Sequence, residues 1–385
     1  MKSNPAISTT LTPTTRRDYD TTRLDYDHGE TRLQTMTTRK LKVAILDDYH
    51  NLSPAIFSPL SAQIDLSYYA STLNPHDATH RDALIQRLHP YEAIVTMRER
   101  TPFPADLVSQ LPNLRLLLTQ GTRNLALDLP ALSAHGVTVT GTTGRPPEAV
   151  VVPSTVQHTW GLVLALAREI PRDDARLKTN PQAWQGRPLA MNLAGKTLGI
   201  LGLGKLGAET ARIGVQAFGM RVVAWSANLT QQQADHQAVR MGLQPGVFAV
   251  AASKQALFET ADVVSVHCVL SDRSRGVVGR DELARMKPSA LLVNTSRGPL
   301  VDEQALLECL HAGHIRGAAL DVFDREPLPA ASPWRSTPWG TAGRSQVVLS
   351  PHMGYGEEEQ IQGWYRECAD NLRRWLAGEE VMRLN

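Results

Sequence analysis

The sequence has few cysteines, almost no net charge and no long unbroken apolar run. Its three cysteines, Cys268, Cys309 and Cys368, are odd in number and far apart, which argues against a disulfide framework and against a CxxC metal site. We therefore expect a reducing compartment, the cytoplasm, and no bound metal. The most apolar stretch, 149–167, is broken by Pro153 and is too short and polar to favour a membrane span.

The charge of the chain is nearly balanced. There are 40 basic and 38 acidic residues, and residues 1–40 carry the whole excess of +2, so no basic surface for nucleic acid or acidic membrane is expected. The same 40 residues contain eleven threonines and a near-repeat, TTRRDYD then TTRLDYD. With so few large apolar residues this segment is expected to be a disordered extension, and its acidic residues argue against an organelle address.

After residue 40, short β-branched apolar runs alternate with segments of helical spacing, which indicates parallel strands covered by helices. We expect strands at 41–48, 92–97, 114–119 and 137–141, with helices at 80–88 and 105–111. A second block of strands is expected at 196–201, 221–225, 262–267, 290–295, 315–322 and 347–351. Two blocks predict an α/β protein with two Rossmann-like, doubly wound parallel-sheet domains.

Two segments interrupt this alternation. Residues 155–169 form a helix that is apolar around most of its circumference, which predicts burial inside the protein or in a subunit interface. Residues 327–344 are rich in Pro, Ser and Gly and are expected to form a surface loop, either a functional rim or an incidental insertion.

The sharpest local signal is TLGILGLGKLGAETARIG at 197–214, where an apolar strand runs into glycines and then into a helix expected to open at Ala208. Gly202 allows a tight turn, Gly204 lets the backbone approach a pyrophosphate, and Gly207 allows close packing of helix against strand. The flanking strands make a dinucleotide site the favoured interpretation of this motif.

The second strand of this unit ends at Trp225, where such folds normally place an acidic residue for the ribose hydroxyls. Here Ser226 follows, so nothing repels a 2′-phosphate, yet no arginine follows before Arg240. The predicted cofactor is NAD or NADP, with the phosphate state open.

Three further strand ends carry polar residues. Arg297 in NTSRG suits the two-pronged binding of a carboxylate, and Glu326 with His352 forms a pair suited to proton transfer, because a carboxylate favours the imidazolium form. Alone, each has a simpler interpretation, namely a surface arginine, a solvated acid or a satisfied core histidine. The coincidence of these residues with Asp321 at successive strand ends favours a catalytic site.

Together these motifs resemble the D-isomer-specific 2-hydroxyacid dehydrogenase family. The resemblance covers 41–385 and rests on GLGKLG, VVSVH, NTSRGPLVDEQAL, AALDVFDREPLP and LSPHMGY. It implies a cofactor domain at 151–352 inserted into a discontinuous substrate domain at 41–150 and 353–385. It also implies a homodimer formed through the cofactor domains, to which the helix at 155–169 contributes.

The resemblance implies roles for single residues. Arg297 would bind the substrate carboxylate and carbonyl, and His352 would be the acid/base that Glu326 orients. Further residues would bind the dinucleotide: Gly202, Gly204, Lys205, Leu206, Gly207, Ser226, Cys268, Thr295, Ser296, Asp321 and Gly354. In the first domain, Arg98 to Thr101 and the loop 120–124 would face substrate and cofactor, and Arg98, Thr101 and Gly121 are the predicted substrate-binding residues.

The sequence departs from the family pattern at three positions: Ser226 replaces the acid, Cys268 stands where a proline is usual, and Gln157 replaces a glutamate. The expected activity is hydride transfer between NAD(P)H and a small 2-keto or D-2-hydroxy acid.

Two other functions compete with this one. Formate dehydrogenase is a rival that Glu326 disfavours, and a nucleotide-sensing corepressor on the same fold is the alternative. Since no C-terminal regulatory domain is recognised, serine synthesis is not specifically expected. Arg98, Arg100 and Arg123 either bind a second acidic group or are solvated charges.

Overall fold

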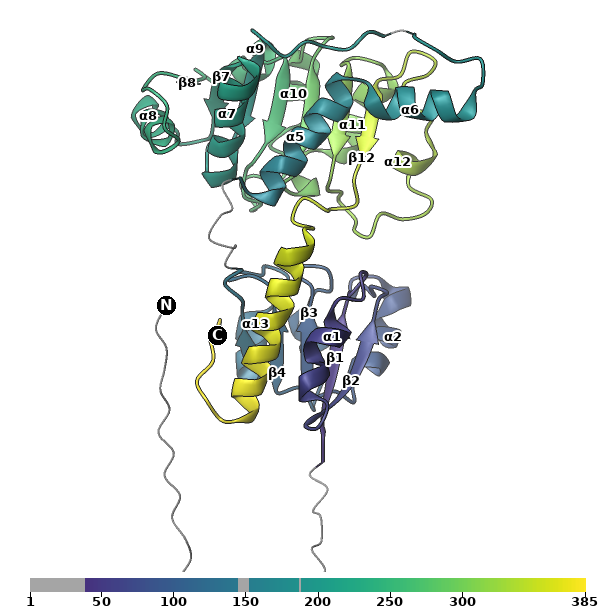
Figure 1. Cartoon of the computed structure of the whole chain (residues 1–385), viewed down its shortest axis with the longest axis vertical. Coiled ribbons are helices and arrows are strands. Elements are labelled where there is room, and N and C mark those ends of the chain that lie inside the picture. The colour runs from purple at the N-terminus through teal and green to yellow at the C-terminus, as the bar shows by residue number, and fades with distance from the viewer. Residues whose placement is uncertain (1–38, 145–151, 187) are drawn as a thin grey trace, which may run out of the picture. The chain divides into compact units, whose positions relative to one another are not determined.

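The computed structural model describes residues 39–144, 152–186 and 188–385, and these contain two parallel β-sheets (Figure 1). One sheet has five strands in the order β2-β1-β3-β4-β5, and the other has seven in the order β12-β11-β10-β9-β6-β7-β8. This arrangement confirms the predicted α/β fold class with two Rossmann-like sheets. The extension predicted to be disordered, 1–40, lies outside the described residues except for its last two.

The five-stranded sheet consists of β1 (Leu41–Leu46), β2 (Ile64–Tyr69), β3 (Ala93–Thr96), β4 (Leu116–Thr119) and β5 (Thr138–Thr140). Four of these strands were predicted. The strand that was not predicted is β2, which lies at the edge of the sheet beside β1 and whose residues IDLSYY are mostly part-exposed or exposed. A strand on the edge of a sheet carries a weaker apolar signal than the fully buried β3 and β4.

The seven-stranded sheet consists of β6 (Thr197–Leu201), β7 (Arg221–Trp225), β8 (Phe248–Val250), β9 (Val263–Val266), β10 (Leu291–Asn294), β11 (Gly317–Leu320) and β12 (Gln346–Leu349). Six of these were predicted, and the three-residue edge strand β8 was missed. The central strands β6, β9, β10 and β11 are buried along their whole length, as their uninterrupted apolar runs predict.

Helices cover both faces of the sheets, and their bounds follow in chain order. They are α1 (Ser53–Phe57), α2 (Ala78–Leu88), α3 (Ala105–Val108), α4 (Leu129–Ala134), α5 (Ser154–Ala167), α6 (Ile170–Thr179), α7 (Lys205–Phe218), α8 (Gln231–Arg240), α9 (Lys254–Thr260), α10 (Arg280–Arg285), α11 (Glu303–His311), α12 (Pro333–Ser336) and α13 (Glu358–Leu376), with 3-10 turns η1 (Ser58–Leu60) and η2 (Gly298–Leu300). In these ranges, no helix is both long and apolar enough to cross a membrane.

The apolar helix predicted at 155–169 is α5, and its burial is internal to the chain. Val156 and Val163 are fully buried in the same core as Leu198 of β6, and the Trp160 ring stacks on Phe218 of α7 with centroids 4.6 Å apart. The helix therefore packs inside the seven-stranded unit, whereas its expected contribution to a subunit interface stays a prediction.

The last helix, α13, returns to the five-stranded sheet. Its residues Trp364, Tyr365 and Leu372 are buried with Val43 and Val95 of that sheet, as Figure 1 shows for the yellow helix beside β4. The predicted boundary near 150 lies outside the described residues, so the domain limits 41–150, 151–352 and 353–385 stay a prediction.

The segment 327–344 is mostly an exposed loop, as predicted, but a buried anchor within it was not predicted. It contains the short helix α12, whose Trp334 is almost completely buried in the core formed by β9, β10 and α11. The indole of Trp339 donates a hydrogen bond to the Trp334 carbonyl at 3.1 Å. Pro, Ser and Gly content gave no signal for this anchoring, which rests on two tryptophans.

Candidate active site

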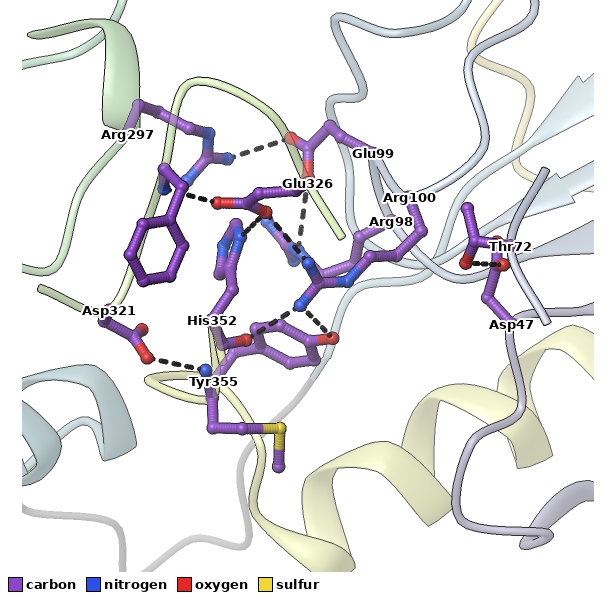
Figure 2. Close-up of polar contacts among 12 residues, drawn as sticks. Asp47, Thr72, Arg98, Glu99, Arg100, Arg297, Asp321, Glu326, His352 and Tyr355 are labelled. Carbon is purple, nitrogen blue, oxygen red and sulfur yellow. Dashed lines mark hydrogen bonds and ion pairs between the residues drawn. The ribbon is translucent and has the colours of Figure 1, made fainter. Parts of the chain in front are cut away.

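Polar residues gather where β10, β11 and β12 end. The carboxyl ends of parallel strands meet at one edge of a sheet, and Arg297, Asp321 and His352 each follow one of these strands (Figure 2). A pocket of about 670 Å³ is lined by Arg297, Glu326 and His352 and also by Arg98 and Arg100 of the five-stranded unit. The geometry thus brings together the three residues predicted to be catalytic.

His352 and Glu326 form a close pair. The His352 Nδ1 and Glu326 Oε2 atoms are 2.5 Å apart, and both side chains are about four-fifths buried. The Phe323 N–H donates to the other carboxylate oxygen at 2.9 Å. Burial raises the pKa of Glu326, but the hydrogen bond and charge of His352, the Phe323 N–H and Arg100 together hold it below its usual range. The ionised Glu326 carboxylate holds the His352 ring through Nδ1, so Nε2 is the ring nitrogen that is not bonded to Glu326.

The backbone of His352 has an unusual conformation, with φ at 55°. Left-handed backbone costs energy in a residue other than glycine, so neighbouring contacts must hold it. The Asp321 carboxylate does so by accepting the N–H groups of Met353 at 2.8 Å and Gly354 at 2.9 Å. Asp321 is buried, and burial raises its pKa, yet hydrogen bonds from His158, Ser350 and the backbone lower it overall. In the described structure Asp321 therefore positions the turn that carries His352.

Arg100 contacts the pair from the other sheet. It follows β3, and its guanidinium donates to Glu326 Oε2 at 2.9 Å, to the His352 carbonyl at 2.8 Å and to the Tyr355 hydroxyl at 3.3 Å. Its side chain is nine-tenths buried. Of the two interpretations offered for Arg100, the solvated charge is wrong, because the side chain is buried and paired with Glu326, whereas a second anion site stays a prediction. Arg123, by contrast, is exposed.

Arg297 is oriented by its own turn. Asn294 at the end of β10 accepts the Ser296 N–H at 3.0 Å and donates to the Arg297 carbonyl at 2.9 Å. The guanidinium bonds the Ser296 carbonyl at 2.8 Å and Glu99 Oε1 at 3.0 Å. Asn294 was not predicted as a site residue. Glu99 lies within the range 98–101 that was expected to face substrate and cofactor, but its hydrogen bond with Arg297 was not predicted.

The glycine motif has the geometry predicted for a dinucleotide site. Gly202 has φ of 102°, and a Cβ on Gly207 would lie 2.2 Å from the Gly202 carbonyl oxygen, so both positions require glycine. A Cβ on Gly204 would meet open space. Helix α7 begins at Lys205, three residues earlier than predicted, and no side chain caps it. Its free N–H groups and the open flank of Gly204 fit a pyrophosphate.

The remaining cofactor candidates surround this turn. Leu206 is part-buried and Lys205 exposed at the start of α7, and Ser226 follows β7, part-exposed. Cys268 donates its thiol to the Leu201 carbonyl and accepts the Ser296 hydroxyl on its own carbonyl at 2.7 Å. Thr295 is buried, with its hydroxyl 2.7 Å from that of Thr159. In the described ranges, no group of three or more His, Cys, Asp or Glu is arranged to hold a metal ion.

The three substrate candidates of the first domain differ in position. Arg98 lines the pocket, with its guanidinium over the Tyr355 and Trp364 rings. Gly121 leaves room for the Arg98 guanidinium, because a Cβ at position 121 would lie only 3.2 Å from Arg98 Nη1. Thr101 is buried and donates its hydroxyl to Asp47 at 2.8 Å, so in this structure that hydroxyl braces the loop.

Comparison with known proteins agrees with this geometry. Residues 160–354 match the family model described as D-isomer specific 2-hydroxyacid dehydrogenase, NAD binding domain. The glyoxylate reductase of Aeropyrum pernix is 34% identical over 281 residues, which are 71% of this chain and 77% of that protein. The D-3-phosphoglycerate dehydrogenase of Bacillus subtilis is 30% identical over 298 residues, covering 77% of this chain and 51% of that protein. The chain thus spans about half the length of this second relative.

A solved structure supports the same assignment. The phosphoglycerate oxidoreductase from Vibrio cholerae o395 is 34% identical, covers 88% of this chain and 99% of its own, and superposes with a TM-score of 0.74. Family model, sequence relative and fold agree over most of the described residues. The chain therefore belongs to the D-isomer specific 2-hydroxyacid dehydrogenase family, a family of NAD-binding oxidoreductases.

Proposed function

We propose that this protein interconverts a 2-keto acid and the corresponding D-2-hydroxy acid by hydride transfer with NAD(P)H. The observation that carries the proposal is the 2.5 Å contact between His352 Nδ1 and Glu326 Oε2 in a pocket that also contains Arg297. A proton donor and a carboxylate clamp in one pocket are what reduction of a 2-keto acid requires.

The dinucleotide would lie at the glycine turn. Gly202, Gly204 and Gly207 with the start of α7 would hold the pyrophosphate, and Thr295, Ser296 and Cys268 would lie on the nicotinamide side. When bound, the nicotinamide supplies or accepts the hydride. Ser226 carries no charge to exclude a 2′-phosphate, so NADH and NADPH both require testing.

The chain's own residues account for the remaining chemistry. Arg297 holds the substrate carboxylate with two parallel hydrogen bonds and polarises the adjacent carbonyl. Nε2 of His352 gives its proton to the carbonyl oxygen during reduction and takes it back in the reverse reaction. Glu326 holds the ring through Nδ1 and stabilises the imidazolium form.

We also infer that two copies of the chain associate through α6 and the residues after it. Four large apolar side chains are more than half exposed between positions 170 and 189: Ile170, Leu177, Trp184 and Leu189. A surface with this concentration of exposed apolar side chains is typical of a protein interface.

The test is a turnover screen on the purified protein. Glyoxylate, hydroxypyruvate, pyruvate and longer 2-keto acids are each combined with NADH and NADPH, and oxidation of the dinucleotide is followed by absorbance. We expect turnover of at least one pair, and a loss of about 100-fold or more in His352→Ala with dinucleotide binding retained. Tight dinucleotide binding without turnover of any pair would contradict the proposal and favour the corepressor-like alternative.

A further inference from the structure

Glu99 places a carboxylate inside the proposed substrate pocket. It lies between Arg98 and Arg100 in the loop after β3, and its Oε1 accepts a hydrogen bond from Arg297 Nη2 at 3.0 Å. Its other oxygen lies 3.6 Å from Nε of Arg98. Burial raises the pKa of Glu99, but the charges of Arg297 and Arg98 outweigh burial and hold it below its usual value of 4.5. Glu99 is therefore ionised at neutral pH.

The arginines of this pocket are matched by acids. Arg100 is paired with Glu326, and Arg325 is paired with Asp77 on the rim. Arg297 and Arg98 share Glu99. In the part of the chain that the structure describes, every arginine lining the pocket thus has a carboxylate neighbour, and these residues are Arg98, Arg100, Arg297, Arg325, Asp77, Glu99 and Glu326. Asp324 adds a further acid to the lining.

A substrate carboxylate that binds two N–H groups of Arg297 must lie beside Glu99 or displace it, because Glu99 already accepts a hydrogen bond from Nη2. The nearest remaining cation for Glu99 is Arg98, which it already approaches. With the substrate bound, the pocket then holds the substrate carboxylate on Arg297 and the Glu99 charge beside Arg98. Neither arginine is left to neutralise another negative group.

Resting on the proposed function, we propose that Glu99 is a specificity-determining residue that makes this site select 2-keto acids with one negative charge over those with two. A second anionic group on the substrate would enter a pocket where Glu99 already occupies Arg98 and the first substrate carboxylate occupies Arg297. Like charges at close range in a partly desolvated pocket repel strongly, because screening by water is reduced.

The test compares two substrates that differ by one charge, 2-oxoglutarate and its 5-methyl ester, on the wild-type protein and on Glu99→Gln. We expect the wild type to prefer the ester by about tenfold or more in kcat/KM, and Glu99→Gln to lose most of this preference by gaining activity on 2-oxoglutarate. Glu99→Asp keeps the charge and should keep the preference. Asp106→Asn, which removes a carboxylate from an exposed ion pair with Arg81 outside the pocket, is the matched control and should change neither value.

Binding separates this proposal from the proposed function. Calorimetric titration of the same two compounds into protein saturated with the oxidised dinucleotide needs no turnover. A protein that reduces no 2-keto acid but whose Glu99→Gln variant binds 2-oxoglutarate about tenfold more tightly would contradict the enzyme assignment and leave the role of Glu99 supported. Equal preference in wild type and Glu99→Gln, or a wild-type preference for 2-oxoglutarate, would overturn the role of Glu99 whatever the turnover.

Discussion

Glu326 accepts hydrogen bonds from three different parts of the chain. Phe323 contributes a backbone N–H, His352 its imidazole and Arg100 its guanidinium. Two of these partners follow strands of the seven-stranded sheet, whereas Arg100 follows β3 of the other sheet. The Glu326 carboxylate, which holds His352, is therefore held in turn by Arg100 from the five-stranded sheet. This contact gives Arg100 a positioning role.

Replacing Arg100 with Gln tests this role. Since Arg100 is one of the groups that lower the pKa of Glu326, its removal should raise that pKa and move the acidic limb of the kcat/KM profile for keto-acid reduction to higher pH. We expect kcat to fall about tenfold, as one charge-assisted hydrogen bond is lost. Arg100→Lys should recover part of the profile. A variant that loses thermal stability but keeps the wild-type profile would show a purely structural role.

Arg297 offers a second test at the level of one side chain. Lysine keeps the positive charge but cannot form two parallel hydrogen bonds with a carboxylate. Arg297→Lys should therefore lower kcat/KM about 100-fold, or about 3 kcal/mol, while fluorescence titration shows unchanged dinucleotide affinity. Wild-type kinetics in this variant would mean that the substrate carboxylate binds elsewhere.

At the level of elements, Asp262 connects the start of β9 with its neighbours. Its carboxylate accepts the Thr197 N–H at the start of β6 at 2.9 Å and the Lys287 ammonium at 3.0 Å. Burial raises the pKa of Asp262, but these two hydrogen bonds outweigh it and hold the pKa below the usual 3.8. A carboxylate with a lowered pKa stabilises the folded state above its unfolded pKa and loses that contribution as the pH falls through its folded pKa.

Asp262→Asn should therefore lower the free energy of unfolding by about 1–3 kcal/mol at pH 7, because buried donors lose a charged acceptor. The difference from wild type should narrow as the pH falls below about 5 and through the folded pKa. Urea unfolding at a series of pH values measures the free energy of unfolding of both proteins. Asp106→Asn, in an exposed ion pair, is the control and should have little effect. A difference that does not depend on pH would contradict the assignment to the ionised carboxylate.

The strands and helices differ in how well the sequence predicted them. Buried strands such as β4 and β10 are nearly continuous apolar runs, as is β1 apart from its exposed Lys42, and all were found. The edge strands β2 and β8 were missed, since they bury less and have a weaker pattern. Helix α12 was missed because its burial depends on Trp334 fitting a distant core, which local composition does not encode.

For the molecule as a whole, the site combines residues from both sheets. Strand ends in the sequence predicted Arg297, Glu326 and His352, because each sheet edge can be inferred from its own strands. They did not predict which charges pair between sheets. The pairs Arg100–Glu326 and Arg297–Glu99 join residues 226 and 198 positions apart, and only the folded chain brings them together.

The inferred dimer is also a property of the whole molecule. Trp184 and Leu189 are about three-quarters exposed, so replacing both with Glu should prevent association while leaving the fold intact. We expect light scattering after size exclusion to give a dimer for the wild type and a monomer for this double variant. Val239→Glu on α8, an apolar position that is about half exposed, should stay dimeric. A monomeric wild type, or a dimeric double variant, would contradict the inferred dimer.

The most direct test of the central claim follows the hydride itself. The protein is incubated with a 2-keto acid that it turns over and with reduced dinucleotide that carries deuterium at both C4 positions, and the product is analysed by NMR and chiral chromatography. The proposed function predicts deuterium at C2 of a D-2-hydroxy acid, formed about 100-fold or more slowly by His352→Ala. Dinucleotide oxidation without deuterium at C2, or an L product, would contradict it.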